Sequence, residues 1–385
     1  SPAHHRPHRG RIRMTPEEMT AAAVEATGLD DFGGDSFRAG LDAYCRSIDE
    51  AQLNDIGHIA VAANVTASLS NRLKVVDWVK LHPEIREEEI VAPVFVIGMF
   101  RAGTTLLSNL FDCDGGNRPL LRWEAGDSIP PPHQNEFRRG PRVDAVAESA
   151  AMLDMLNPDI SKVHHETADG PTECLTLLGQ DFKSLVWEAI TNVPSYSGWL
   201  MQADSRSAYD YHRLALQTLQ SGGVRGRWTL KSPHHAIALD ALTAVYPDAR
   251  LVLLHRDPVA LCGSVCSLIR TLSKTFSDAD HSAYIGRHWS DLLETSYQRI
   301  GAFRAARPDF PLLDVDYADL MADPVGTVSR IYQFTGDPLT EPAARAMEAF
   351  VAANPQGRHG RHEYALADYG LDEAEIRERF APYVG

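Results

Sequence analysis

An anion-binding loop is the clearest chemical feature of the sequence. The segment 98–105 contains two glycines and Arg101, follows an apolar run and leads into a helical stretch. Glycines let a backbone approach a ligand closely, and N–H groups at a helix N-terminus bind phosphate. A Walker-type loop, which binds a triphosphate, has Lys where this chain has Thr104. The segment therefore suits one phosphate with a neighbouring anionic group better than a triphosphate with magnesium.

A second anion site is indicated further along the chain. Arg256 follows the apolar run 251–254, and Ser264 lies eight positions later in the helix that comes next. Arg offers a bidentate fork, and a Ser near the positive end of a helix adds a hydroxyl. The triplet 255–257 also spells the protein-kinase sequence His-Arg-Asp, but a kinase has Asn where this chain has Cys262. The kinase interpretation of the triplet is therefore rejected.

Transfer of an anionic group between oxygens also needs a cation and a base. Lys231 follows a short apolar run at a predicted strand end, where it suits the charge of a departing phosphate. Glu124 lies where a second strand should end, and it is the first choice for the base. His234 and His235 are the main rivals, and a further histidine pair at positions 164 and 165 shares what remains.

The elements that position these residues alternate between strand and helix. Apolar runs at 94–97, 228–230, 251–254 and 312–315 are each followed by a loop and a helical pattern. This alternation predicts an α/β fold, with a mainly parallel sheet covered by helices on both faces in three layers. Ligands bind at the carboxyl ends of the strands in such sheets. Every loop singled out above lies at that edge.

The chain divides into regions of different character. Residues 1–14 are expected to be disordered, and residues 15–90 form an N-terminal helical extension. The remaining residues, 91–385, form the main domain, which contains a helical insertion at 126–220. This insertion is rich in aromatic residues and is interpreted as the acceptor-binding lid, although the same aromatics also suit a core.

The composition excludes some classes of partner. The formal net charge of −15 argues against nucleic acid and against an anionic membrane surface. No apolar run approaches the roughly 20 residues of a membrane-spanning helix, and no signal peptide is visible. Five cysteines without a CxxC pair fit a reducing compartment, so a cytoplasmic location is expected. High Ala and Arg usage suggests a bacterial source.

The phosphate loop resembles that of a known family. Residues 94–107 are similar to the 5′-phosphosulfate loop of sulfotransferases that use 3′-phosphoadenosine-5′-phosphosulfate (PAPS), whose pattern is Gly-x-x-Arg-Ser-Gly-Thr-Thr. This chain departs from the pattern only at Ala102, which replaces Ser and removes one hydroxyl contact. The resemblance extends over about residues 91–364, with three motif regions in the right order. It implies the P-loop-like sulfotransferase fold.

The resemblance also implies roles for individual residues. The donor's 5′-phosphosulfate would be held by Arg101, Ala102, Gly103, Thr104 and Thr105, and its 3′-phosphate by Arg256 and Ser264. Tyr317 corresponds to an aromatic residue near the adenine, and Arg358 and Gly360 lie in a C-terminal loop over the 3′-phosphate. Lys231 matches a Lys that contacts the sulfuryl or bridging oxygen. Glu124 resembles the catalytic Glu of tyrosylprotein sulfotransferases, whereas cytosolic members use a His two residues after the Lys, where this chain has Pro233.

The implied activity is sulfuryl transfer from PAPS to a hydroxyl of a small organic acceptor, such as a sterol, lipid, phenol, glycan or natural product. No metal is required. The alternatives are a nucleoside or small-molecule kinase with a degenerate P-loop, and a nucleotide-binding protein without catalysis. Magnesium-dependent ATP turnover would identify the first alternative, and tight binding of 3′,5′-diphosphoadenosine (PAP) without transfer would identify the second. The oligomeric state does not follow from the sequence.

Overall fold

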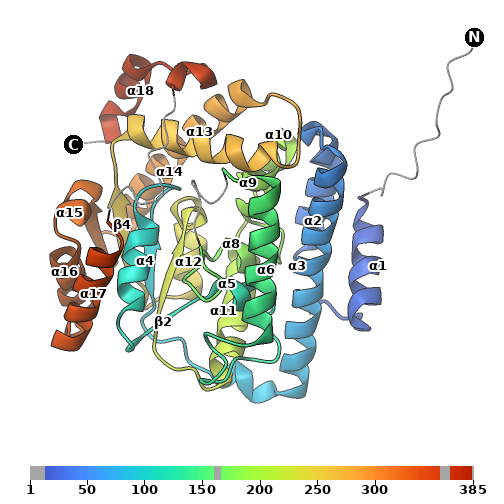
Figure 1. The fold of residues 1–385 in the computed structure, drawn as a ribbon, viewed down its shortest axis with the longest axis horizontal. Helices are drawn as coiled ribbons and strands as arrows, with labels where there is room; N and C mark the ends of the chain where they lie inside the picture. The colour runs from blue at the N-terminus through green and yellow to red at the C-terminus, as the bar shows by residue number, and fades with distance from the viewer. Residues whose placement is uncertain (1–13, 160–165, 356–364, 384–385) are drawn as a thin grey trace, which may run out of the picture.

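A computed structural model describes residues 14–159, 166–355 and 365–383. The N-terminal segment predicted as disordered falls almost wholly outside these ranges. The order of the elements in space is shown in Figure 1.

A five-stranded sheet lies at the centre of the described chain, and all of its neighbouring strands pair in parallel. Its order is β2-β3-β1-β4-β5. Every residue of β1 is buried, as expected for a strand covered on both faces. The strands are β1 (Val94–Ile97), β2 (Asn117–Pro119), β3 (Arg227–Ser232), β4 (Arg250–His255) and β5 (Leu312–Asp316).

Helices cover both faces of this sheet, which confirms the predicted three-layer α/β fold. On one face, α4 (Thr104–Asp112) packs against β1, β2 and β3, and α16 (Pro324–Thr335) packs against β5. On the other face, the ring of Phe95 from β1 meets side chains of α11 (Arg206–Ser221) and of the 3₁₀ turn η3 (Pro233–Ile237). The remaining helices of this part of the chain are α5 (Arg122–Gly126), α12 (Leu239–Val245), α13 (Pro258–Lys274), α14 (Ser282–Ala306), α15 (Tyr317–Ala322), α17 (Glu341–Ala353) and α18 (Glu373–Phe380).

Three helices precede the sheet, in the region predicted as a helical extension. They are α1 (Pro16–Thr27), α2 (Arg38–Ser47) and α3 (Asp55–Leu81), and α1 packs along α3 (Figure 1). A capping box between Thr15 and Glu18 starts α1, because each side chain accepts a hydrogen bond from the other residue's backbone N–H. Buried residues of α2 and α3 belong to the same hydrophobic core as β1.

The described residues of the predicted insertion at 126–220 are largely helical, and most of their aromatic side chains belong to the core. Trp187, Tyr196 and Tyr209 are almost fully buried, and Trp187 stacks on the ring of Phe182. Burial of these rings favours the core alternative over an acceptor-lining role. The helices here are α6 (Pro141–Leu156), α8 (Leu175–Gly179), α9 (Val186–Ile190), α10 (Pro194–Leu200) and α11.

Within the described ranges, no helix is both long enough and apolar enough to cross a membrane.

Candidate active site

The loop between β1 and α4 has the backbone geometry that anion binding needs. Arg101 and Gly103 both have positive φ angles, 71° and 97°, and Gly103 is the N-cap of α4. Gly98 lies against Leu254 and Ala102, where an added Cβ would come within 3.4 Å of both side chains. Thr104 is buried and Thr105 is exposed at the start of the helix. The loop thus brings α4's N-terminus, with its positive dipole, to the carboxyl edge of the sheet.

The two predicted anion sites meet at this loop. The Arg101 Nε donates a hydrogen bond of 3.1 Å to the Oγ of Ser264 in α13. The Arg256 guanidinium, at the end of β4, donates to the backbone carbonyl of Arg101. It also lies over the ring of Tyr317, with 4.4 Å between its central carbon and the ring centroid. Four residues that are far apart in the sequence therefore converge on one corner of the sheet.

Lys231 lies on the opposite side of β1 from this corner and is paired with two carboxylates. Its backbone neighbour across the sheet is Val96, two residues before Gly98. Its Nζ is 3.0 Å from Oε1 of Glu166 and 3.6 Å from Oε1 of Glu173, and only 1% of its side chain is exposed. Burial disfavours the ammonium, but the two carboxylates outweigh this effect, so the pKa of Lys231 is raised. Lys231 therefore carries a positive charge that is paired with two carboxylates.

Glu124 lies in a different environment from the one expected for a base. Its carboxylate is fully buried and forms two hydrogen bonds with the Arg118 guanidinium, of 2.6 and 2.7 Å. It also accepts a 2.8 Å bond from the backbone N–H of Leu121. The Arg118 guanidinium lies between the rings of Phe137 and Trp228, at 4.3 and 4.4 Å. This geometry is typical of a structural ion pair, which here lies at the N-terminus of α5.

His234 and His235 are also enclosed. Both side chains are fully buried in η3, and burial lowers the pKa of His234 to about 3 and that of His235 well below its ordinary value. The Nδ1 of His235 lies 2.7 Å from the hydroxyl of Tyr209. Among the described residues, neither ring nitrogen of His234 has a hydrogen-bond partner. Both rings are therefore neutral, and they lie in the 3₁₀ turn that follows Lys231 and the end of β3.

Two residues near Lys231 were missed from the sequence, namely Glu166 and Glu173. They flank the Asp-Gly-Pro turn at 169–171, and two carboxylates on either side of a turn were the available signal. The predicted sites at Arg358, Gly360 and the 164–165 histidine pair lie outside the described residues. Within the described ranges, no group of three or more His, Cys, Asp or Glu residues is arranged to hold a metal ion.

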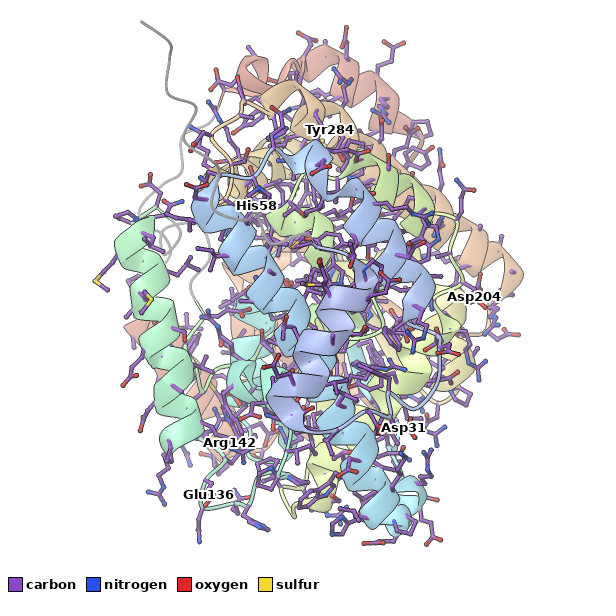
Figure 2. All side chains as sticks on the ribbon, turned by 90° about the vertical axis from the view of Figure 1, so that its right-hand side faces the viewer. Asp31, His58, Glu136, Arg142, Asp204 and Tyr284 are labelled. Carbon is purple, nitrogen blue, oxygen red and sulfur yellow. The ribbon has the colours of Figure 1, made fainter. Side chains whose placement is uncertain are left out.

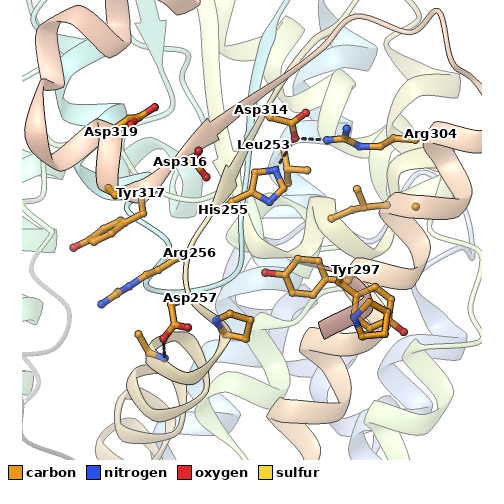
Figure 3. Close-up of a pocket in the computed structure, with 17 residues that line it drawn as sticks. Leu253, His255, Arg256, Asp257, Tyr297, Arg304, Asp314, Asp316, Tyr317 and Asp319 are labelled. Atoms are coloured by element: carbon orange, nitrogen blue, oxygen red, sulfur yellow. Dashed lines mark hydrogen bonds and ion pairs between the residues drawn. The ribbon is translucent and has the colours of Figure 1, made fainter. Parts of the chain in front are cut away.

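A cavity of about 1150 Å³ opens beside the Arg256 corner. Figure 3 shows Arg256 and Tyr317 at one side of it and Tyr297 and Arg304 at the other. Asp314 links His255 and Arg304 in the cavity wall, and these two partners help to lower the pKa of Asp314 to about 2 against the effect of burial. Lys231 does not line the cavity. The convergence of polar groups, rather than this cavity, therefore locates the site.

Solved structures of two mycobacterial proteins share this fold over nearly their whole length. Sulfotransferase STF9 from Mycobacterium avium is 33% identical, with a TM-score of 0.89 and 97% of each chain covered. Sulfotransferase STF1 from Mycobacterium tuberculosis H37Rv is 34% identical, with a TM-score of 0.86, 97% of this chain and all of that chain covered.

The sequence comparisons agree with the structural ones. Curated relatives in Mycobacterium bovis and Mycobacterium tuberculosis are 27% identical over 267 residues and are named omega-hydroxy-beta-dihydromenaquinone-9 sulfotransferase Stf3. The match covers 65% of this chain and 64% of those relatives. The model of the sulfotransferase family matches residues 93–341, which include β1, the phosphate loop, Lys231 and the Arg256 corner. The chain therefore belongs to the sulfotransferase family.

Proposed function

We propose that this sulfotransferase takes its sulfuryl group from PAPS and transfers it to a hydroxyl of a small organic acceptor. The observation that carries the proposal is the convergence of Arg101, Ser264, Arg256 and Tyr317 on the loop between β1 and α4. Two basic groups and a helix N-terminus at one corner suit a ligand with two separate anionic groups. PAPS carries such groups, at its 5′ and 3′ positions.

The donor's 5′-phosphosulfate is assigned to the loop residues Arg101 to Thr105. Its 3′-phosphate is assigned to Arg256 and Ser264, since a guanidinium and a hydroxyl provide complementary donors. Tyr317 stays the predicted neighbour of the adenine. The contacts predicted for Arg358 and Gly360 remain predictions of the resemblance alone.

Lys231 is proposed to stabilise the charge that develops on the leaving phosphate. Sulfuryl transfer is a loose in-line displacement, in which protein charges stabilise the departing and equatorial oxygens. The new bond joins the acceptor oxygen to sulfur, and the broken bond leaves its electron pair on a phosphate oxygen of PAP. A cation at the end of β3, beside the phosphate loop, is suitably placed for this role.

The acceptor's proton needs a base, and Glu173 is our candidate. Its carboxylate lies beside Lys231, and 12% of its side chain is exposed, against 6% for Glu166. The sequence-based choice, Glu124, has both carboxylate oxygens engaged by Arg118. His234 is sealed in the core, where burial favours its neutral form but separates it from an acceptor. The geometry thus favours a carboxylate next to Lys231.

An apolar hydroxylated compound is the proposed acceptor class. The curated relatives are named for a hydroxylated menaquinone derivative. In the present chain, α6 exposes Met152, Met155 and Leu156 at its C-terminal end. In the sequence, these exposed apolar residues precede the segment that carries Glu166 and the proposed base, Glu173.

The first experiment is calorimetric titration with PAP, with AMP and with ATP in the absence of magnesium. We expect tight binding of PAP, weak binding of AMP, and a loss of PAP affinity of about tenfold to a hundredfold in Arg256→Ala. Transfer is then tested with PAPS and a panel of hydroxylated acceptors. Equal affinity for PAP and AMP would contradict a PAPS donor and direct attention to the kinase alternative.

A further inference from the structure

A second cavity, of about 480 Å³, lies where the N-terminal helices meet α11. Its walls come from the loop before α2, from α3, from the 3₁₀ turn η2 (Pro83–Glu87) and from α11. Among the described residues, it shares no lining residue with the cavity beside Arg256, and it contains none of the groups assigned above to the donor or the acceptor. This cavity is therefore separate from the candidate active site.

The charged side chains of this cavity are mainly basic. Within the described ranges, its lining includes three arginines and a single carboxylate, that of Asp210, which pairs with the Arg206 guanidinium 3.1 Å away. Arg86 and Arg213 are exposed, and neither forms an ion pair in the part of the chain that the structure describes. Two guanidiniums are thus available at the solvent side of the cavity, in a protein whose formal net charge is −15.

The contact between η2 and α11 brings these two arginines to one cavity. Arg213 lies one helical turn before Gln217, whose buried side-chain amide donates a 3.2 Å hydrogen bond to the backbone carbonyl of Arg86. The same amide donates a 2.8 Å bond to the carbonyl of Glu88. The backbones that carry Arg86 and Arg213 are therefore fixed relative to each other before a ligand binds, which lowers the entropic cost of binding.

The inner wall of the cavity is a buried polar network. Arg72 is 4% exposed, and its guanidinium donates to Oδ1 of Asp181 at 3.0 Å and to Oγ of Ser36 at 3.2 Å. The buried Lys183 ammonium donates to Oδ2 of Asp181 at 2.9 Å and to Oγ of Ser207 at 2.5 Å. Two cations thus share the Asp181 carboxylate behind the cavity, so its inner wall also favours an anionic ligand.

The lining indicates the chemical class of that ligand. Guanidiniums bind phosphate and sulfate oxygens through paired N–H donors. The volume lies in the range of small-molecule sites and leaves room for more than an inorganic anion. Val76, Tyr211 and Leu214 also line the cavity and suit an apolar or aromatic group next to the anion.

We propose that this cavity binds a small organic phosphate or sulfate monoester, with the oxyanion between the guanidiniums of Arg86 and Arg213. The bound anion bridges η2 and α11, and so joins the N-terminal extension to the insertion. This inference goes beyond the proposed function and does not depend on the donor or the acceptor, since the two sites have no lining residue in common among those described.

Calorimetric titration of the whole chain with phenyl phosphate and with phenyl sulfate tests the site. The double variant Arg86→Gln, Arg213→Gln should bind the preferred ester at this site about tenfold more weakly, or worse, than the wild type. The control is Arg139→Gln, Arg345→Gln, which removes two exposed arginines outside the cavity and changes the net charge equally. We expect this control to bind like the wild type.

A charge-reversal variant gives an independent readout. Leu214→Glu keeps both arginines but places a carboxylate in the lining, and we expect it to abolish ester binding at this site. Thermal unfolding without ligand reports whether each variant is folded, and PAP affinity should match the wild type in all of them. Should the double variant fail to fold, Leu214→Glu still decides the question.

The preferred ester shows whether the natural ligand is a phosphate or a sulfate monoester. Binding that is equal in the wild type, the double variant and Leu214→Glu would overturn the site. An equal loss in the control pair would attribute the effect to overall charge, and would overturn the site as well. Failure of the wild type to bind PAP would contradict the proposed donor and leave this site intact.

Discussion

Glu124 and Glu173 are the two carboxylates considered for the base, and their surroundings favour different roles. Glu124 is paired with the Arg118 guanidinium inside the core, whereas Glu173 shares the Lys231 ammonium and keeps some exposure. Breaking a buried ion pair from one side leaves the other charge uncompensated. A substitution at each residue therefore distinguishes the buried ion-pair carboxylate from the proposed base.

We expect Glu124→Gln to lower the free energy of unfolding by roughly 3–5 kcal/mol, because Arg118 stays buried without its partner. We expect Glu173→Gln to fold normally and to lower kcat by about 10²–10⁴, the usual loss for a general base. Urea denaturation and steady-state transfer rates measure the two effects. A stable Glu124→Gln protein that has lost transfer would restore Glu124 as the base.

Three buried histidines make the stability of the protein sensitive to acid. Burial lowers the pKa of His212 and of His234 to about 3, and that of His235 well below its ordinary value. The unfolded chain binds protons at these residues below about pH 6.5, while the folded chain does not. Their contribution to stability is therefore complete above this pH and is lost progressively as the pH falls toward 3.

We expect each histidine to contribute a slope of about 1.4 kcal/mol per pH unit between roughly pH 5.5 and pH 4. His234→Leu removes one of these groups, and its ring nitrogens form no hydrogen bond among the described residues. The variant's free energy of unfolding should thus depend less steeply on pH by about that amount. Urea denaturation at several pH values measures the slope, and equal slopes in both proteins would contradict the expectation.

The phosphate loop and α15 form one unit at the scale of elements. Gly103 has a φ of 97°, and an added Cβ would come 2.9 Å from the ring of Tyr317, the first residue of α15. The same ring lies against the Arg256 guanidinium. A side chain at position 103 would therefore strain the backbone and displace the aromatic partner of Arg256.

We expect Gly103→Ala to weaken PAP binding by about tenfold or more, with a strain cost of roughly 1–2 kcal/mol. Gly115→Ala is the matched control, because nothing lies within 4 Å of an added Cβ there. Calorimetry with PAP and thermal unfolding of both variants provide the measurements. Equal PAP affinity in the two variants would show that the loop tolerates the added methyl group.

The strands and the phosphate loop were predictable because local signals specify them. Continuous apolar runs predict buried parallel strands, and the glycine spacing at 98–103 marks a turn into a helix. The parallel order of the strands then brings Arg256 and Lys231 to the same edge as Arg101. The sequence therefore predicts which residues share this edge without any information about the acceptor-binding site.

The partners of Glu124 and Lys231 could not be predicted from the sequence, because these contacts depend on tertiary packing. Arg118 lies six residues before Glu124, and nothing in its local pattern shows that β2 and α5 turn the two side chains together. Glu166 is 65 residues from Lys231 in a segment of weak periodicity. The proposal of Glu173 instead of Glu124 as the base therefore depends on the tertiary structure.

The distribution of apolar surface bears on the acceptor at the scale of the whole molecule. The C-terminal end of α6 and the N-terminal end of α3 both meet the end of α13 and the residues just after it: Asn157 donates to Thr271 and Thr275, and the backbone N–H of Asn54 donates to Phe276. Ile56 and Ile59 on α3 are exposed, like the end of α6. In Figure 2, His58 is labelled at this end of α3.

We expect these side chains to contact the apolar part of an amphiphilic acceptor whose hydroxyl reaches Glu173. Each methylene group removed from water contributes at most about 0.8 kcal/mol, so partial contact along a chain lengthened by several carbons should lower KM by about tenfold or more. The double variant Met152→Ser, Met155→Ser should lose this dependence on chain length and keep its kcat with short acceptors. Leu81→Ser, at the opposite end of α3, removes a comparably exposed apolar residue and should behave like the wild type.

The measurement is KM against chain length in a series of primary alcohols that share one reacting group. A KM that is independent of chain length in the wild type, or a dependence that persists in the double variant, would show that the apolar ends of α3 and α6 do not contact the acceptor.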